Sequence, residues 1–375
     1  MEKLKIVLAG NYSKGEGYPR INTIINGLKD RCNFKEIFYP LWKGKEEKEK
    51  SVKKPLKKLI PFLKSLFFFA SHIEEFKNAD AVIVGFPGYF EVFFIKLFLI
   101  LTGSKATLYL DYFFSIYESL VYERGILKKN SFFSKALFYF DRASLLIPDR
   151  VIIDTDEHRD FINDLFKIDR KKFLTIPVGE SEEYFSFLPY PEHKNRFNVL
   201  FFGTFLNLHG IDKIKEAIKL LEQEKSIHFI LVGKGKNDFL FKDSNLKNIT
   251  FINEFTSPQK LKGYIQKSHL ILGIFGGNER AKVVIPCKIY DALACGRPVI
   301  TGKTPAAERV FKNKDFVILC ENNGKEIAKS ILNFKKRDLS ELKSLSETAY
   351  RFYKTNFSPE AIGELILKDV LNEKK

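Results

Sequence analysis

Short apolar runs bounded by glycine and polar residues recur along the whole chain. Such runs are typical of strands buried on both faces of a parallel sheet, and the amphipathic segments between them are typical of covering helices. The runs are Leu4–Ala9, Ala81–Gly85, Ala106–Leu110, Val151–Ile153 and Phe173–Gly179 in the first half, and Asn198–Phe202, His228–Gly233, Ile249–Glu254 and Val299–Thr301 in the second. The pattern predicts an α/β fold.

The first run of each half is followed by a glycine-containing loop and then by an amphipathic helix. The first loop starts at Gly10 and its helix at Ile21, whereas the second loop starts at Gly203 and its helix at Ile211. Strand, loop and helix in this order open a Rossmann-like unit. The first loop lacks the G-x-G-x-x-G spacing, so it supports dinucleotide binding only weakly.

These two openings predict two domains, and a chain of 375 residues is long enough for both. The polar stretch Glu180–Arg196 contains Pro189 and Pro191, lacks periodicity and predicts a linker. We therefore expect an N-terminal domain over residues 1–185 and a C-terminal domain over residues 193–357.

The segment Phe275–Thr301 holds the most informative chemistry. Pro286 and Gly296 stand where a short helix would begin and end. Lys288 falls in the first turn, where the helix dipole disfavours a cation but where amides and lysine together would bind phosphate. Asp291 lies about one turn further on the same face, where its carboxylate can accept hydrogen bonds from a ribose diol. This layout suits a nucleoside diphosphate, and an exposed Lys288–Asp291 ion pair is the alternative interpretation.

The string IPCKIYDALACGRPVITG, from Ile285 to Gly302, resembles the donor-site helix of GT-B glycosyltransferases, in particular family 4. The resemblance implies two Rossmann-like α/β domains facing across a cleft, with a nucleotide sugar bound mainly by the second. It also implies that Asp291 takes the place of the glutamate that binds the ribose. Family members often carry another glutamate eight positions earlier, where this chain has Val283.

The resemblance implies roles for residues at the ends of other predicted strands. His209 stands where the family commonly has a basic residue for the diphosphate, and it would be a weaker, pH-dependent cation; a structural histidine is the alternative. Asp111, His209 and Lys288 are the expected catalytic residues. Asp111 would be a catalytic or acceptor-orienting carboxylate, and a helix N-cap is the alternative. Arg20 could instead be an exposed arginine, and Glu308 could instead cap a helix. The expected nucleotide-sugar contacts are Gly203, Thr204, Gly233, Glu254, Lys288, Asp291 and Glu308, and the expected acceptor contacts are Asn11, Tyr12, Arg20 and Arg124.

The implied reaction moves a sugar from a nucleotide-diphosphate donor to a hydroxyl of a glycan or lipid-linked acceptor, with retention, in cell-surface glycan or glycolipid synthesis. We expect no metal and no cofactor, because no D-x-D cluster stands in a suitable context and Lys288, His209 and helix N-termini would stabilise the departing diphosphate. A GT-B nucleotide-sugar epimerase and a non-catalytic GT-B scaffold are the alternatives. The resemblance further implies that a C-terminal helix at 358–375 joins the first domain.

The net charge of +16 permits nucleotides, an anionic membrane surface and nucleic acid as partners. The chain has no recognisable module for reading nucleic acid, so we expect no specific nucleic-acid partner. The segment 43–69 combines lysines with Phe67, Phe68 and Phe69, which is typical of an amphipathic helix at a membrane surface. A core helix with a solvated lysine face is the alternative, although three consecutive phenylalanines cannot all face one core.

The cysteines and the N-terminus predict a cytoplasmic protein. Cys32, Cys287, Cys295 and Cys320 lack metal-binding spacing, which predicts reduced and mostly buried thiols. Met1–Leu8 lacks the apolar core of a secretory signal, and no apolar run is long enough to span a bilayer. We expect a cytoplasmic location with peripheral contact to the inner face of the membrane.

Overall fold

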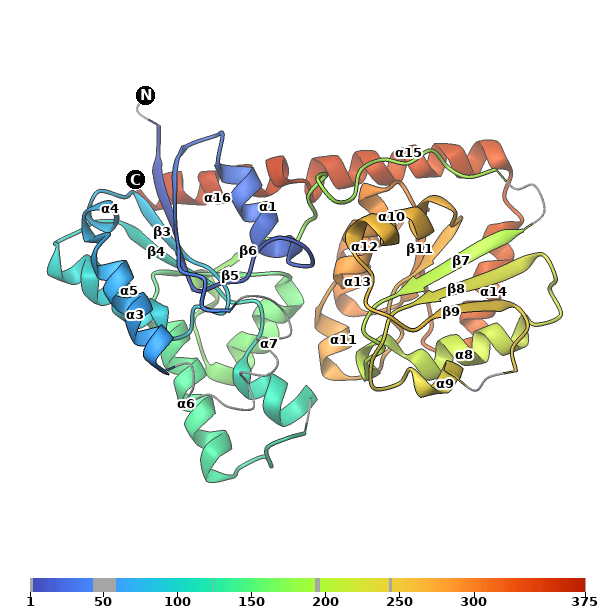
Figure 1. Ribbon diagram of the computed structural model, residues 1–375, viewed down its shortest axis with the longest axis horizontal. Helices are drawn as coiled ribbons and strands as arrows, with labels where there is room; N and C mark the ends of the chain where they lie inside the picture. The colour runs from blue at the N-terminus through green and yellow to red at the C-terminus, as the bar shows by residue number, and fades with distance from the viewer. Residues whose placement is uncertain (1–2, 43–58, 124, 193–195, 243–244, 375) are drawn as a thin grey trace. The chain divides into compact units, whose positions relative to one another are not determined.

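The chain forms two compact units, seen in the computed structural model of Figure 1, which describes residues 3–42, 59–123, 125–192, 196–242 and 245–374. Unit 1 comprises Met1–Pro177 and Ile362–Lys375, and unit 2 comprises Val178–Ala361. The predicted boundaries are therefore wrong for residues 178–185 and 358–361, which belong to unit 2. Much of the predicted linker is packed within that unit, because the buried Arg297 guanidinium donates hydrogen bonds to the carbonyls of Leu188 and Pro189, both at 2.8 Å.

Unit 1 is built on a parallel sheet with the strand order β2-β1-β3-β4-β5-β6 (Figure 1). The strands are β1 (Lys5–Gly10), β2 (Asn33–Phe38), β3 (Ala81–Val84), β4 (Thr107–Asp111), β5 (Arg150–Ile153) and β6 (Phe173–Thr175). The helices are α1 (Pro19–Leu28), α3 (Leu59–Ala70), α4 (Ile73–Lys77), α5 (Glu91–Leu101), α6 (Phe132–Leu146) and α7 (Asp156–Phe166), with the π-helix η2 (Glu118–Glu123) and the 3-10 turn η3 (Arg170–Lys172).

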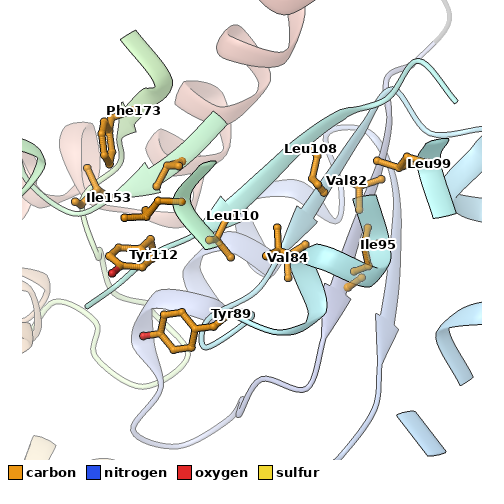
Figure 2. Close-up of a cluster of buried hydrophobic side chains, with 14 of the residues drawn as sticks. Val82, Val84, Tyr89, Ile95, Leu99, Leu108, Leu110, Tyr112, Ile153 and Phe173 are labelled. Atoms are coloured by element: carbon orange, nitrogen blue, oxygen red, sulfur yellow. The ribbon is translucent and has the colours of Figure 1, made fainter. Parts of the chain in front are cut away.

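The core of unit 1 lies on both faces of this sheet. On one face, side chains of β3, β4 and β5 pack with α5, as Figure 2 shows for Val82, Leu108 and Ile95. On the other face, Ile6 and Leu8 of β1 share a cluster with Ile362, Ile366 and Val370 of the C-terminal helix α16 (Pro359–Glu373). The strands are continuous apolar runs because both of their faces are covered.

Unit 2 contains a second parallel sheet, with the order β12-β11-β10-β7-β8-β9. The strands are β7 (Phe197–Phe202), β8 (Ile227–Val232), β9 (Ile249–Ile252), β10 (Leu270–Leu272), β11 (Val299–Gly302) and β12 (Val317–Cys320). The helices are α8 (Ile211–Leu220), α9 (Phe239–Lys242), α10 (Pro258–Gln266), α11 (Glu279–Val283), α12 (Cys287–Ala294), α13 (Pro305–Phe311), α14 (Gly324–Lys335) and α15 (Leu339–Asn356), with the 3-10 turn η4 (Asn207–His209). From β7 onward this is the order of a doubly wound Rossmann sheet.

The predicted α/β architecture with two Rossmann-like units is confirmed. The apolar pattern does not predict β2, β10 or β12. Strand β2 lies at a sheet edge and carries Lys35 and Glu36, so polar residues interrupt its apolar run. Strand β10 spans only three residues, which is too short for a recognisable pattern.

Helix α3 confirms that the consecutive phenylalanines do not share one environment. Phe67 is 78% exposed, Phe68 is half-buried and Phe69 is fully buried. Residues 43–58 of the predicted membrane segment lie outside the described residues. Within the described ranges, no helix is both long enough and apolar enough to cross a membrane.

Candidate functional site

The carboxyl ends of β7 and β10 form the switch point of the unit 2 sheet, where doubly wound folds bind ligands. The loops that leave these two strands are hydrogen-bonded to each other. The Phe275 amide donates to the carbonyl of His209 at 3.1 Å, and the Gly276 amide donates to the carbonyl of Leu208 at 3.0 Å. These bonds hold the His209 turn against the start of the segment that leads to α12.

Glycines permit close approaches at this edge of the sheet. Gly203 has φ of +147°, and a Cβ there would lie 3.0 Å from His209 Cε1 and 3.2 Å from Lys288 Nζ. Gly233, with φ of +138°, packs against the Gly203 carbonyl, and Gly235 packs against the Thr204 carbonyl. The structure therefore brings together five of the predicted site residues, which are Gly203, Thr204, His209, Gly233 and Lys288.

Lys288 has a buried amino group beside an aromatic ring. Its side chain is 5% exposed, and its Nζ has no hydrogen-bond partner in the described part of the chain. The Nζ lies 3.9 Å from the centroid of the Phe201 ring. Burial lowers the pKa of Lys288 to about 7, although the charge of Asp291 opposes this shift. A lysine in these surroundings is favourably charged only when an anion lies beside it.

His209 completes the polar lining beside Lys288. It is 6% exposed, and among the described residues its Nδ1 has no hydrogen-bond partner. Burial, and then the charge of Lys288, hold the pKa of His209 well below its usual value. The prediction of a pH-dependent cation therefore needs correction, because in this state His209 is a neutral imidazole that can donate or accept one hydrogen bond.

Helix α12 points its N-terminus toward this cluster through Lys288 in its first turn. Its N-cap residue is Pro286, which makes no side-chain capping hydrogen bond. Helix α12 thus adds the partial positive charge of a helix N-terminus to the ammonium group. Together with the lining of Gly203, this arrangement is suited to an anion with several oxygens, such as a diphosphate.

Asp291 lies one turn along α12 and is also buried. The exposed Lys288–Asp291 ion pair considered above is therefore wrong, since neither side chain is at the surface. Asp291 shares a side-chain hydrogen bond with the buried Glu180. Burial first, and then the charge of Glu180, raise the pKa of Asp291 well above its usual value, so the two carboxyl groups share a proton.

Glu254 and Glu308 each lie near a lysine of their own. Glu254 follows β9, is exposed and lies 3.8 Å from Lys260. Glu308 lies within α13 and is 3.7 Å from Lys303. The helix cap proposed as the alternative for Glu308 is instead Thr304, whose hydroxyl accepts from the Ala307 amide at 3.2 Å.

Two of the residues predicted for the acceptor, Asn11 and Tyr12, follow β1 at the switch point of the unit 1 sheet, between β1 and β3. Asn11 donates to Glu91 at 2.7 Å and to Ser65 at 3.1 Å, and all three are buried. Tyr12 donates to Glu36 at 2.6 Å. Arg124 lies outside the described residues.

Arg20 and Asp111 form a buried ion pair in unit 1. The Arg20 Nε lies 2.6 Å from Asp111 Oδ1, and Arg20 Nη1 donates to the Ile176 carbonyl at 3.0 Å. An exposed Arg20 and a helix-capping Asp111 are both ruled out, because both side chains are buried and Asp111 ends strand β4. Within the described ranges, Arg20 Nη2 and Asp111 Oδ2 have no hydrogen-bond partner.

Comparison with protein families gives a match within unit 2. Residues 196–336 match the family model described as Glycosyl transferases group 1. This segment, which is less than half of the chain, is similar to the group 1 glycosyltransferases. The expected resemblance to GT-B glycosyltransferases and the expected enzyme class, a glycosyltransferase, are confirmed, and the assignment to family 4 stays a prediction. A search of curated protein sequences gives no match.

Solved structures show that this glycosyltransferase has the GT-B fold. The sucrose-phosphate synthase of Thermosynechococcus elongatus superposes with a TM-score of 0.68 and 14% identity over 100% of both chains. A glycosyltransferase from Rickettsia africae superposes with a TM-score of 0.64 and 16% identity, also over 100% of both chains. Anabaena HepE, solved in complex with UDP, gives a TM-score of 0.64 and 14% identity over 98% of this chain and 100% of its own.

Sequence reasoning missed three residues at the sites of this glycosyltransferase. Glu180 was placed in a linker, because its partner Asp291 is distant in sequence and neither periodicity nor a motif connects them. Phe201 lies in an apolar run and gives no sign that Lys288 lies over its ring. Glu91 is the first residue of the apolar helix α5. A carboxylate at the start of a helix is ordinarily interpreted as a favourable interaction with the helix dipole.

The shared proton of Glu180 and Asp291 predicts a pH dependence of stability for the glycosyltransferase. The folded pair keeps a proton that the unfolded carboxyl groups release above about pH 4, so stability is lost as pH rises toward the raised pKa of the pair. The loss is at most about 1.4 kcal/mol per pH unit. We expect Glu180→Gln to reduce it, because the variant removes the charge of Glu180 beside Asp291 while the burial of Asp291 stays. Denaturant unfolding between pH 5 and pH 8 measures it.

The control for this variant is Glu341→Gln, which changes an exposed carboxylate on α15 paired with Arg337 at 3.2 Å. Its stability should follow the pH dependence of the wild type. Lys288 is the charged neighbour of Asp291. The Tyr353 hydroxyl donates to the Glu180 carbonyl at 2.8 Å and does not titrate in this range. Parallel curves for wild type and Glu180→Gln would show that no proton is shared.

Proposed function

We propose that the protein is a family 4-type retaining glycosyltransferase that uses a nucleotide-diphosphate sugar. The observation that carries this proposal is the buried Lys288 Nζ, which lacks a hydrogen-bond acceptor in the described chain and lies beside His209 and Gly203. Its pKa of about 7 in the empty site would rise when a diphosphate binds, because an opposite charge favours the ammonium form. HepE has been solved with UDP and with UDP-glucose, which makes uridine nucleotides the first to test.

The proposed reaction depends on positive groups beside the diphosphate, which gains negative charge as it leaves the sugar. Lys288 would bind the diphosphate oxygens, His209 would donate a hydrogen bond from Nδ1, and the amides of the first turn of α12 would add their dipole. Asp291, one turn along the helix, would accept from the ribose. Because these groups supply the positive charge, we propose that transfer proceeds without a metal ion, and chelation of divalent cations should leave turnover unchanged.

The acceptor is proposed to be a hydroxyl of a glycan or a lipid-linked sugar in cell-surface synthesis. The TarM glycosyltransferase of S. aureus, solved as a variant with UDP and α-GlcNAc-glycerol, superposes on 82% of this chain with a TM-score of 0.56 and supports an acceptor of the glycan class. Determining the anomeric configuration of the product by NMR tests retention. An epimerised nucleotide sugar formed without acceptor would favour the isomerase alternative, and binding without turnover would favour the scaffold.

The donor class is tested by thermal unfolding with a panel of nucleosides, nucleoside monophosphates and nucleoside diphosphates. A ligand at 100 times its Kd stabilises the folded state by about 2.7 kcal/mol, which corresponds to a rise of about 5–10 °C in Tm. We expect one nucleoside diphosphate to give this rise and its monophosphate to give much less. Equal shifts for the two would contradict a diphosphate site.

A further inference from the structure

Helices α3, α5 and α6 of unit 1 form one continuous layer. The ring of Phe62 on α3 lies 5.8 Å from Phe90 and 6.4 Å from Phe94, measured between centroids. Phe140 on α6 lies 4.6 Å from the same Phe90 and 6.1 Å from Phe93. These aromatic contacts join the three helices, which Figure 1 shows as neighbours in unit 1.

This layer exposes an unusual set of large apolar side chains. We call them the α3–α5–α6 surface: Leu59, Ile60, Leu63, Phe67, Phe90, Leu97, Ile100, Leu101, Phe132, Phe133, Tyr139 and Leu146. The most exposed are Phe132 at 80% and Phe67 at 78%. Exposed apolar side chains gathered on three adjoining helices are uncommon on monomeric soluble proteins and mark contact with a membrane or a partner.

The charges on the same helices distinguish between these occupants. The cations of the three helices are Lys64, Lys96, Lys135 and Arg142, and none of them is buried. The carboxylates are Glu91 and Asp141, and both are buried. Lys96 is partly neutralised by Asp149, 2.8 Å away in the connection before β5. The three helices therefore expose apolar side chains and cations, and no carboxylate. We call Lys64, Lys96 and Lys135 the cationic rim, whereas the Arg142 Nε donates to the Phe166 carbonyl at 3.0 Å.

A second copy of the chain does not suit this surface. In a two-fold symmetric contact the same patch meets itself, so the cations of one copy would face those of the other. Anionic lipid headgroups would pair with the rim while the aromatic and aliphatic side chains enter the interface between headgroups and acyl chains. Tyrosine and phenylalanine beside lysine are suited to that boundary.

We propose that the α3–α5–α6 surface binds the face of an anionic lipid bilayer. Of the segment 43–69 expected to touch a membrane, only α3 contributes among the described residues, and α5 and α6 add a surface that the sequence did not indicate. The assignment is independent of the donor site in unit 2. Failure of vesicle binding would leave nucleotide binding intact, and failure of nucleotide binding would leave vesicle binding intact.

The test compares the full chain and its variants on vesicles of phosphatidylcholine with phosphatidylglycerol and on vesicles of phosphatidylcholine alone. The apolar variant is Phe67→Ser/Ile100→Ser/Phe132→Ser, with one change on each helix. Its control removes exposed apolar side chains elsewhere: Leu220→Ser/Phe239→Ser/Leu371→Ser. A charge variant, Lys64→Gln/Lys135→Gln, removes two cations of the rim. The substituted side chains are exposed, so thermal unfolding should show unchanged folding for every variant.

We expect the wild type and the control to sediment with the anionic vesicles, and less so as salt increases. The apolar variant should lose roughly tenfold or more in partition coefficient, and the charge variant about fivefold for each lysine. Equal partitioning of the apolar variant and the control would overturn the proposal. So would a wild type that ignores vesicles but forms a dimer in light scattering that the apolar variant abolishes, because the surface would then be a protein interface.

Discussion

Replacing Lys288 by methionine is expected to weaken the binding of the nucleoside diphosphate by about 1.5–3 kcal/mol, which is roughly a 10- to 150-fold increase in Kd. The loss follows from removing a charged hydrogen-bond donor to phosphate. The same change should stabilise the empty protein by about 1–3 kcal/mol, because methionine does not bury an ammonium group that lacks an acceptor. Calorimetric titration and denaturant unfolding measure the two effects.

The opposite directions of these effects separate a binding residue from a structural one. If Lys288 served only the fold, replacing it would lower the stability of the protein. The nucleotide affinity of the protein would then change no more than this loss of stability requires. The exposed Lys260→Met serves as the matched control, since Lys260 makes only a 3.8 Å contact with Glu254. A Lys288→Met protein with wild-type nucleotide affinity would remove Lys288 from the site.

The pKa of Lys288, about 7 in the empty protein, adds a pH test of the same residue. Above that pH the free lysine is largely neutral, whereas the bound diphosphate requires the ammonium form. Binding must then take up a proton, so Kd should rise by up to about tenfold per pH unit above pH 7. Below pH 7 this contribution disappears. Titrations in buffers of different ionisation enthalpy detect the proton, and Lys288→Met should abolish the uptake.

Breaking the ion pair between Arg20 and Asp111 should have the largest effect on stability. Arg20→Met leaves the Asp111 carboxylate buried without its partner, and such changes cost about 3–5 kcal/mol. Burial already raises the pKa of Asp111 against the opposing charge of Arg20, so loss of Arg20 would drive this carboxyl group further toward protonation. The only tryptophan of the chain, Trp42, belongs to unit 1, so its fluorescence during urea unfolding reports on this unit.

A double variant tests whether the pair also has a role in transfer. Arg20→Met/Asp111→Leu removes both charges and should recover most of the lost stability, because paired apolar replacements of buried ion pairs are often neutral. If Asp111 orients the acceptor, this stable protein should bind donor normally and fail in transfer. Normal transfer by the double variant would assign the pair to the fold alone, and a double variant no more stable than Arg20→Met would show that the pair is not the source of the loss.

The fold was predictable because its strands are buried on both faces. Runs such as Ala81–Gly85 and His228–Gly233 have no polar interruptions, and the glycine loops after β1 and β7 follow directly from them. The edge strand β2 escaped prediction because solvent on one side permits Lys35 and Glu36 in its pattern. Local signals therefore identified the strands with uninterrupted apolar runs, including the edge strands β6 and β9, and missed the polar β2 and the three-residue β10.

The donor helix was predictable from Pro286 and Gly296, and the structure ends α12 at Ala294 with Gly296 at φ of +65°. What the sequence could not give was the environment of Lys288 and Asp291. Whether a lysine is exposed or buried over an aromatic ring depends on residues distant in the chain, here Phe201 and Glu180. The assignment of Glu180 to a linker failed for the same reason, since hydrogen bonds to Asp291 and Phe357 leave no trace in local composition.

A structure of the protein with a bound nucleoside diphosphate tests the central claim most directly. We predict that a phosphate oxygen lies within hydrogen-bond distance of Lys288 Nζ, about 2.7–3.2 Å, above the Gly203 backbone and beside His209 Nδ1. A nucleotide bound elsewhere, with Lys288 still directed at the Phe201 ring, would contradict the account.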